Sequence, residues 1–308
     1  MASGPTFRVD LHFDLIQSLR LLHALLECDG DVRVHPRDYP KLTKLEEVFG
    51  LSVSDEIEGV PVLPEVEVDH DGRPMTRLGR ITRPLIFAHG MVERCRSLWA
   101  RDRSVRACFV GRLHRDRRRV LRQWMHRQFP EVEVELPSQA AVDRRVELRK
   151  TVRHCARRLL RGPLRSLRRY VGVPPAERRT TCRNVVFVTS DRGWRHPTKA
   201  WDASYFQRLA NAKYVLCPDG KFVWTYRFFE AALCGAIPII QNRCDLYDGF
   251  RFYTMDDLLD NLEWRFEDAR HNFKLCRERC TVSLDRLNTE IHRLLRRSTA
   301  RRHAEQRA

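Results

Sequence analysis

The residues best suited to chemistry lie in one short stretch, LCPDGKFVWTYRFFEAALCGAIPII, which covers residues 216–240. Pro218 and Gly220 are expected to end a buried strand and to let the backbone approach a ligand closely. Thr225 is placed to cap the helix that follows, whose first free N–H groups favour an anion. Arg227, in the first turn, gains nothing from the helix dipole, which disfavours cations at that end. An arginine in this position indicates that a phosphate binds at the same end of the helix.

Glu230 lies one helical turn further on, where its carboxylate could accept two hydrogen bonds from a ribose diol. Spacing alone also fits a plainer arrangement, in which Thr225 is a helix cap and Arg227 and Glu230 form an ion pair on the helix surface. The strand–loop–helix context favours the ligand site, because open parallel sheets bind ligands beyond the carboxyl ends of their strands.

The whole stretch fits the pattern L-C-P-x-G-x-x-x-x-[ST]-x-R-x-x-E-A-x-x-x-G-x-x-P-[VI]-[IL]. This pattern resembles the nucleotide-sugar signature of the exostosin-like glycosyltransferases. FVGRLHRDRRRVL (109–121) resembles the strand and helix that open the nucleotide-binding domain of that family, and VFVTSDRGW (186–194) resembles its base-binding segment. The resemblance is strong over 216–240, moderate over 105–245, and absent over 1–100.

The resemblance implies an α/β fold of GT-B type, with two Rossmann-like domains and a cleft between them. Arg227 would then bind the diphosphate of a UDP- or GDP-sugar, and Glu230 would bind its ribose. Gly220 and Thr225 would shape the phosphate loop, and Lys221 could add a phosphate contact.

Residues from two other strand ends would complete the donor site that the resemblance implies. Gly111 and Arg112 would approach the distal phosphate, while Ser190, Asp191 and Arg192 would border the nucleotide base. The family needs no obligatory metal ion, and we expect no cofactor besides the donor itself.

An inverting transferase also needs a carboxylate or histidine that takes the proton of the acceptor hydroxyl. We expect this base at a strand end of the first domain, where Asp10, His12 and Asp14 follow the first predicted strand in VDLHFDL. His35 and His89 are further candidates. For each of these residues, a helix cap or a satisfied polar group is the competing interpretation.

Metal sites have weak support in the sequence. DHDG (69–72) could be taken for the metal-binding Asp-x-Asp of the other transferase fold, but its setting is that of a polar turn. The ten cysteines form no CxxC pair, which indicates reduced, mostly buried thiols rather than a disulfide or zinc framework. We therefore expect no metal.

Alternating strands and helices must position these residues, and they indicate parallel sheets covered on both faces. The predicted strands cover 7–11, 31–35, 84–90, 106–113, 132–136, 184–191, 213–217 and 237–240. The predicted helices cover 12–28, 41–51, 91–102, 114–129, 202–212, one or two within 255–280, and 284–295. We expect an acceptor-side domain (1–103), a nucleotide-sugar domain (104–283) with a basic helical segment (140–183), and a C-terminal helix (284–308) whose basic tail after Arg296 is disordered.

The formal net charge is +17, but much of the excess is local, because residues 144–183 hold fourteen basic and two acidic residues. A solvated helix covering a sheet face is the plain interpretation of this segment. Residues 144–171 could also lie on an anionic membrane surface. Nucleic acid is not an expected partner, because Tyr170 is the only aromatic side chain among these arginines and base stacking needs several.

Together these features predict a glycosyltransferase that moves a sugar from a nucleotide diphosphate sugar to a hydroxyl of a glycan or glycolipid. We expect it in the cytoplasm, because no signal peptide or membrane-spanning run is evident, with a peripheral location at the inner membrane face as the secondary hypothesis. Two alternatives remain: a basic nucleic-acid-binding α/β protein, and a non-catalytic protein with a nucleotide-sugar fold.

Overall fold

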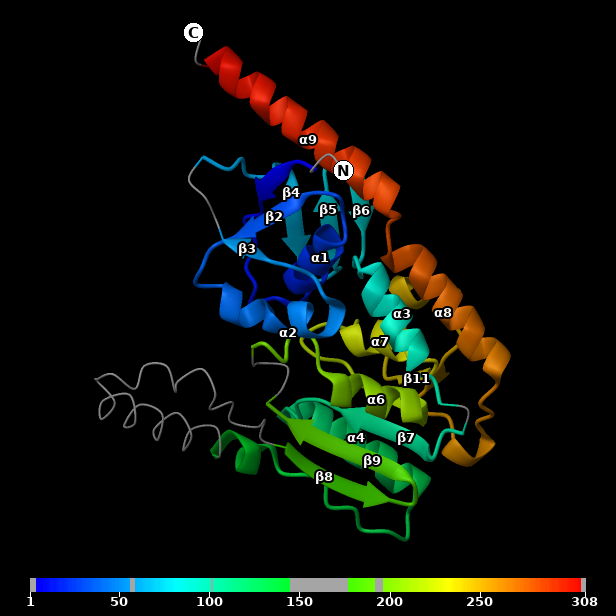
Figure 1. Ribbon diagram of the computed structural model, residues 1–308. Coiled ribbons are helices and arrows are strands. Elements are labelled where there is room, and N and C mark those ends of the chain that lie inside the picture. The colour runs from blue at the N-terminus through cyan, green and yellow to red at the C-terminus, as the bar shows by residue number, and fades with distance from the viewer. Residues whose placement is uncertain (1–3, 56–58, 101, 145–176, 192–195, 306–308) are drawn as a thin grey trace, which may run out of the picture.

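The N-terminal part of the chain combines two small sheets. The computed structural model describes residues 4–55, 59–100, 102–144, 177–191 and 196–305 (Figure 1). A parallel sheet of order β1-β2-β3 is formed by β1 (Thr6–Arg8), β2 (Asp31–Val34) and β3 (Ser54–Asp55). Helices α1 (Ile16–Leu26) and α2 (Tyr39–Phe49) connect these strands. An antiparallel sheet of β4 (Val66–Asp69), β5 (Met75–Leu78) and β6 (Ile81–Arg83) follows, and α3 (His89–Ser97) leads out of it.

A six-stranded sheet of order β12-β11-β10-β7-β9-β8 forms the C-terminal part. Five of its strands run parallel: β7 (Val105–Val110), β9 (Val185–Ser190), β10 (Ala212–Cys217), β11 (Ile237–Ile240) and β12 (Tyr253–Thr254). The edge strand β8 (Glu177–Cys182) pairs with β9 antiparallel. The expected α/β class, with a mostly parallel sheet flanked by helices, is confirmed.

Helices cover both faces of this sheet because its strands carry buried side chains on both sides. Ala107 and Phe109 face α4 (Arg115–Gln128), whereas Cys108 and Val110 belong to the core that includes α6 (Ala203–Asn211) and α7 (Tyr226–Leu233). Asp202 caps α6, since its side chain accepts a hydrogen bond from the Tyr205 N–H, as its position in the sequence predicts.

The sheet core continues into the N-terminal part of the molecule. One buried cluster includes Phe7 and Leu21 from the small parallel sheet and its helix, Val215 from the large sheet, and Phe229 from α7. The C-terminal end of α8 (Phe266–Cys280) also meets the N-terminal part, because the Phe87 N–H donates to the Cys280 carbonyl at 2.7 Å.

Two predicted strands are wrong. Residues 85–88 are buried and lead into α3 without pairing as a strand, so their apolar run reflects burial among helices. Residues 132–136 also form no strand. Val132, Val134 and Leu136 instead pack against the α4 side of the core, and β8 occupies the sheet edge beside β9. The antiparallel β4–β6 sheet and β8 are absent from the sequence-based prediction.

The C-terminal region is more helical than predicted. After α8 (Phe266–Cys280), the helix α9 (Leu284–Glu305) extends away from the body of the molecule (Figure 1). The prediction of a disordered tail after Arg296 is therefore wrong as far as Glu305. Most of the predicted membrane-surface segment, from residue 145 on, lies outside the described residues. Within the part of the chain that the structure describes, no helix combines the length and apolarity needed to cross a bilayer.

Candidate functional site

Two loops meet at the carboxyl end of the large sheet. β7 ends at Val110, and β10, its parallel neighbour, ends at Cys217. Gly111 begins the loop after β7, and Asp219 and Gly220 lie in the loop that leads from β10 to α7. As predicted for an open parallel sheet, the strand ends therefore bring the two glycine-containing loops to the same edge.

Arg227 projects from the first turn of α7 toward the loop after β7. Its Nε donates to the Val110 carbonyl at 3.0 Å, and its guanidinium carbon lies 4.4 Å from the centre of the Phe109 ring. Gly111 makes room for this side chain: a Cβ at that position would lie 2.2 Å from Arg227 Nη2. The Gly111 backbone also has a φ of 153°, which side-chain-bearing residues rarely adopt. The site thus needs glycine at position 111.

Arg117 brings a second guanidinium to the same place. It extends from α4, and its Nε donates to the Asp219 carbonyl at 2.9 Å. A Cβ on Gly220 would lie 2.5 Å from Arg117 Nη2. Burial, followed by the charge of Arg227, lowers the pKa of Arg117 to about 10, so the side chain remains protonated at neutral pH. Sequence reasoning missed this residue, although the HRDRRRVL run in which it lies was recognised.

The charge of Arg227 has no acidic counterpart within the described residues. Arg227 is 7% exposed, and none of the ion pairs between described residues includes it. Its Nη1 is buried and has no hydrogen-bond partner in the described part of the chain. A buried cation without a counter-charge costs free energy that a bound anion would recover. The arrangement can therefore bind a phosphate group, with Arg117 as a second ligand.

Glu230 is engaged inside the protein. Its Oε1 accepts a hydrogen bond from Arg20 Nη2 at 3.3 Å in a buried ion pair, and its Oε2 accepts one from the Tyr205 hydroxyl at 2.7 Å. The plainer alternative, a surface ion pair between Arg227 and Glu230, is therefore wrong. Glu230 as a ribose ligand stays a prediction, since a carboxylate has lone pairs beyond the two used here.

Thr225 and Lys221 lie on either side of the aromatic part of the loop. Thr225 is the N-cap residue of α7, but its hydroxyl makes no capping hydrogen bond, so that part of the prediction is wrong. Its N–H donates to the Tyr247 hydroxyl at 3.0 Å. Lys221 is exposed, and its Nζ lies 3.5 Å from Asp71 Oδ1 of the β4–β5 turn. Its ammonium group therefore links the loop to the N-terminal part.

The predicted base-binding residues lie next to the two glycine-containing loops. β9 ends at Ser190, and Ser190 and Asp191 are both buried. Because β9 pairs with β7, these residues share the sheet edge with Gly111, whose N–H donates to the Val188 carbonyl. Arg112 lies in the same loop, with its Nη2 3.5 Å from Asp143 Oδ2. Arg192 lies outside the described residues.

The three predicted bases, Asp10, His12 and Asp14, are all exposed. Asp14 has defined partners: its Oδ1 lies 3.3 Å from His196 Nε2, and Lys199 donates to its carbonyl oxygen. The hydrogen bond with His196 lowers the pKa of Asp14, while burial lowers the pKa of His196. At neutral pH the pair therefore joins a carboxylate to a neutral imidazole.

The two further candidates, His35 and His89, have local roles. His35 Nδ1 accepts the N–H of Arg37 at 3.2 Å. His89 starts α3, and its Nε2 lies 2.9 Å from the Val282 carbonyl. These contacts match the competing interpretation of satisfied polar groups.

A histidine that sequence reasoning overlooked lies against the start of α7. His70 occupies the β4–β5 turn, and its Nδ1 is 2.9 Å from the Tyr226 hydroxyl and 3.1 Å from Gln17 Oε1. Its ring stacks on that of Tyr226 and meets Trp224 edge-on. Burial lowers the pKa of His70, which favours the neutral ring. The DHDG segment thus contacts the start of α7 through His70 and the preceding loop through Asp71.

No metal centre is formed by the described residues, where no group of three or more His, Cys, Asp or Glu side chains could hold an ion. The cysteines described here are free thiols, and most are buried. The candidate site is therefore built from arginines, glycine loops and a helix N-terminus.

Comparison with known proteins identifies no family for this chain. A scan against models of protein families finds no match, and a search of the curated proteins finds none either. A function for the chain must therefore rest on the chemistry of its own residues.

Proposed function

We propose that this chain is a glycosyltransferase that uses a nucleoside diphosphate sugar, such as a UDP- or GDP-sugar, and glycosylates a hydroxyl of a glycan or glycolipid. The observation that carries the proposal is the buried guanidinium of Arg227, whose Nη1 has no partner among the described residues. It lies between two glycine-containing loops, at the N-terminus of α7 and near Arg117. This combination supports a diphosphate ligand.

In the proposed complex, the diphosphate lies between the Gly111 and Gly220 loops. Arg227 and Arg117 would stabilise the negative charge that develops on the departing nucleoside diphosphate, as would the free N–H groups of α7. The N-terminal part (1–103) would present the acceptor in a GT-B arrangement with the donor-binding part (104–283). The contact of the β4–β5 turn with the loop before α7 supports this orientation.

For the acceptor side, the Asp14–His196 pair is the proposed proton acceptor. The Asp14 carboxylate would hold the imidazole in one orientation through Nε2, as in other carboxylate–histidine pairs. The neutral state of His196 at neutral pH, which follows from its lowered pKa, is the state that a general base requires.

A second candidate function is binding of a nucleoside diphosphate without transfer. Among the described residues, the contacts of Asp14 and His196 include neither Arg227 nor Arg117, which favours it, because transfer needs a base beside the donor. The two candidates differ in one measurable respect: only the transferase releases nucleoside diphosphate from a nucleotide sugar, slowly with water and faster with an acceptor.

Thermal-shift titration with UDP and GDP tests the shared part of both candidates. At least one of the two nucleotides should stabilise the wild type. Arg227→Ala and Arg117→Ala should each raise the Kd for that nucleotide about tenfold or more. One charge-assisted hydrogen bond contributes about 1.5–3 kcal/mol, and tenfold corresponds to about 1.4 kcal/mol. Each variant is compared with its own unliganded melting temperature, so a change in stability alone does not count as lost binding.

Arg119→Ala is the matched control, because Arg119 lies on α4 like Arg117 but is mostly exposed and contacts Asp116. It should bind the nucleotides as wild type does. Absence of any nucleotide that stabilises the wild type would overturn the proposal. Equal losses in Arg117→Ala and Arg119→Ala would show that the site responds only to overall charge.

A further inference from the structure

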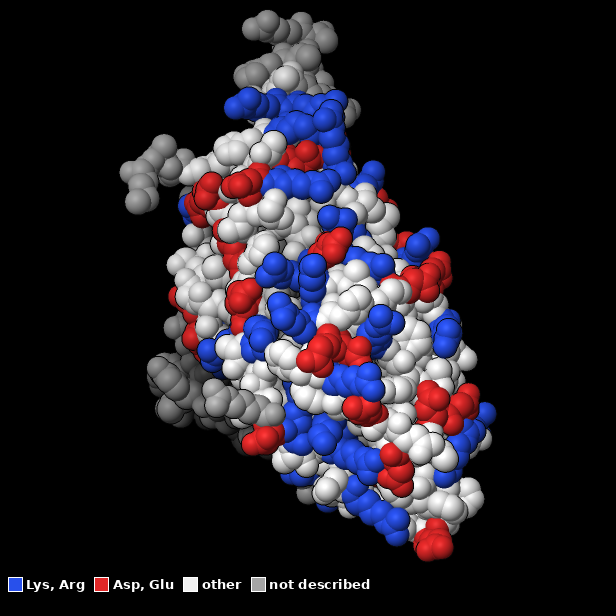
Figure 2. Space-filling model, turned by 90° about the vertical axis from the view of Figure 1, so that its right-hand side faces the viewer, with Lys and Arg blue, Asp and Glu red and all other residues white. Residues whose placement is uncertain are grey.

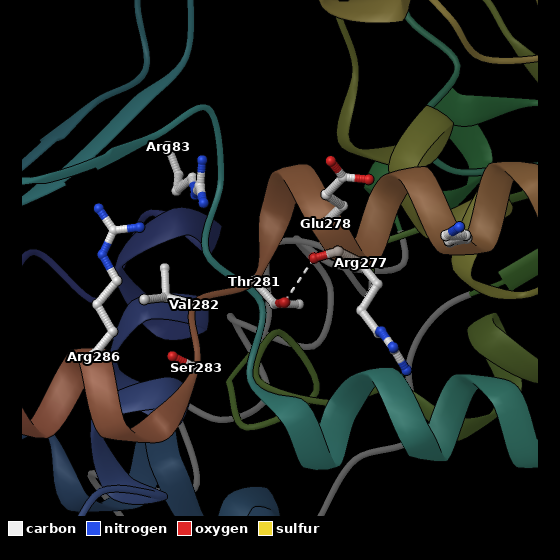
Figure 3. A pocket seen from close by; sticks show the side chains of 8 residues that line it. Arg83, Arg277, Glu278, Thr281, Val282, Ser283 and Arg286 are labelled. Atoms are coloured by element: carbon white, nitrogen blue, oxygen red, sulfur yellow. Dashed lines mark hydrogen bonds between the residues drawn. The ribbon is translucent and has the colours of Figure 1, made fainter.

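A concave surface lies at the junction of α8 and α9, apart from the candidate site. It is a groove of about 410 Å³ that shares no residue with the candidate site, and its lining residues are Arg83, Lys274, Arg277, Glu278, Thr281, Val282, Ser283 and Arg286. Arg83 comes from the end of β6, so the groove joins the N-terminal part of the chain to the two C-terminal helices. Figure 3 shows Arg83 and Arg286 on the side of Val282 and Ser283, with Glu278 on α8.

The groove carries a concentrated positive charge. The groove is lined by four cations, Arg83, Lys274, Arg277 and Arg286, and by a single carboxylate, that of Glu278, which leaves an excess of three positive charges. None of these four cations belongs to an ion pair within the described part of the chain. By contrast, Arg293, two turns further along α9, pairs with Glu290 and Glu65. Like charges around one groove repel each other, and a bound anion would remove that repulsion.

The groove also offers hydrogen-bond donors. Ser283 precedes α9 and Arg286 lies in its first turn, and the first N–H groups of this 22-residue helix are not used within the helix. The Nε of Arg83 is buried and has no hydrogen-bond partner among the described residues. Guanidinium groups bind phosphate oxygens through paired N–H donors, which lysine cannot reproduce. Three of the four cations in the groove are arginines.

The surroundings extend the positive field. Figure 2 shows the face that carries these helices, where Lys and Arg side chains gather over α9 and continue down the molecule between scattered carboxylates. Such a field attracts multiply charged anions over a distance of about 8–10 Å at physiological salt.

We propose that this groove binds a phosphate ester, with Arg83 and Arg286 as its main ligands and Arg277 and Lys274 as further cations. The phosphate can belong to a small molecule in solution or to the headgroup of a membrane lipid, since both present the same oxygens to the groove. This assignment is independent of the nucleotide site at Arg227, because the two sets of residues do not overlap.

The test uses the full chain, with inositol hexakisphosphate as the free probe in isothermal titration. The double variant Arg277→Ala/Arg286→Ala removes two exposed groove cations, and the control Arg270→Ala/Arg296→Ala removes two exposed arginines from the same helices outside the groove. The groove variant should lose at least about tenfold in affinity, or about 1.4 kcal/mol, while the control stays close to wild type. Equal losses in the two double variants, or no binding by wild type, would overturn the proposal.

A second arm distinguishes the two sources of the phosphate. Flotation is measured with vesicles of phosphatidylcholine alone and with added phosphatidylinositol phosphate. If the ligand is a lipid headgroup, wild type and the control should float with the phosphorylated lipid only, and the groove variant should not. If the groove variant loses affinity for inositol hexakisphosphate but the wild type does not float with either vesicle, the ligand is a phosphate ester in solution. Flotation unaffected by the groove variant excludes the lipid source.

Discussion

Arg20 and Glu230 form a buried ion pair that joins α1 to α7. Both side chains are almost fully buried, and Arg20 also donates to the Ala200 carbonyl. Removal of one partner would leave the other charge buried and unpaired, which costs about 3–5 kcal/mol. Replacement of both by apolar side chains avoids that cost. The pair therefore matters more for holding α7 in its orientation than for net stability.

We predict that Arg20→Met lowers the free energy of unfolding by about 3 kcal/mol or more, and that Arg20→Met/Glu230→Leu recovers a large part of the loss. Urea denaturation of wild type, both single variants and the double variant measures the coupling. Arg33→Met is the control, because its pair with Asp31 is partly exposed and should contribute only about 0–1 kcal/mol. An equally small effect for Arg20→Met would contradict the prediction.

At the residue scale, sequence reasoning identified Arg227 but not Arg117. Arg227 stands out because a cation in the first turn of a helix opposes the helix dipole. Arg117 lies among several arginines on α4, and nothing in their spacing tells which one reaches Asp219, a residue 102 positions away in the chain. Glu230 was expected to be free for a ligand, but its partners Arg20 and Tyr205 come from elements whose packing a single sequence does not give.

At the element scale, α1 is buried along nearly its whole length and contains a histidine with an unusual environment. His23 is fully buried beside Phe49 of α2, and it is close to Arg20 of its own helix and to Glu27, which follows that helix. Burial, followed by the charge of Arg20, lowers the pKa of His23 from 6.5 to about 3. The folded chain therefore keeps this ring neutral, whereas the unfolded chain protonates it below about pH 6.5.

We predict that stability falls as pH decreases from about 6.5 toward 3, since the unfolded state then binds a proton that the folded state excludes. The contribution of His23 is about 1.4 kcal/mol per pH unit in this window. His23→Leu should remove this part of the slope in urea titrations at several pH values. His35→Leu, which changes an exposed histidine, should keep it. Burial raises the pKa of Glu27, so this residue makes stability rise as pH falls, which is opposite to the effect of His23. Because Glu27 is present in wild type and in both variants, the comparison between them reports on His23.

The elements that sequence reasoning predicted correctly are those with a clear period or cap. The helix at 202–212 has both, and Asp202 caps it in the structure. The two wrong strands fail for different reasons. Residues 84–88 are apolar without alternation, which does not distinguish a strand from a buried connection. Residues 132–136 alternate, but pairing depends on which segment occupies the sheet edge, and β8 does so from within a region dominated by arginine.

At the scale of the whole molecule, the small N-terminal sheet and the large sheet share one hydrophobic core. Phe7, Leu21, Val215 and Phe229 all belong to it, and the Arg20–Glu230 pair crosses the same junction. Separation of the two parts would expose apolar surface on both sides, at about 25 cal/mol for each Å². The parts should therefore depend on each other for stability.

We predict a single unfolding transition in differential scanning calorimetry, with equal calorimetric and van't Hoff enthalpies. A fragment of residues 104–308 should melt at a lower temperature than the full chain or fail to fold, because the core face of α7 would lose its cover. Two resolved transitions, with the upper one unchanged in the fragment, would show that the parts are energetically independent.

The antiparallel edge strand β8 has a consequence for how the chain behaves at high concentration. An open sheet edge is a template for strands of other molecules, and proteins protect it with charges or short strands. β8 places Arg178 and Arg179 at one edge of the large sheet, and β12 closes the other edge with only two residues, Tyr253 and Thr254. Both edges therefore discourage the pairing of strands between molecules, which limits aggregation through the sheet.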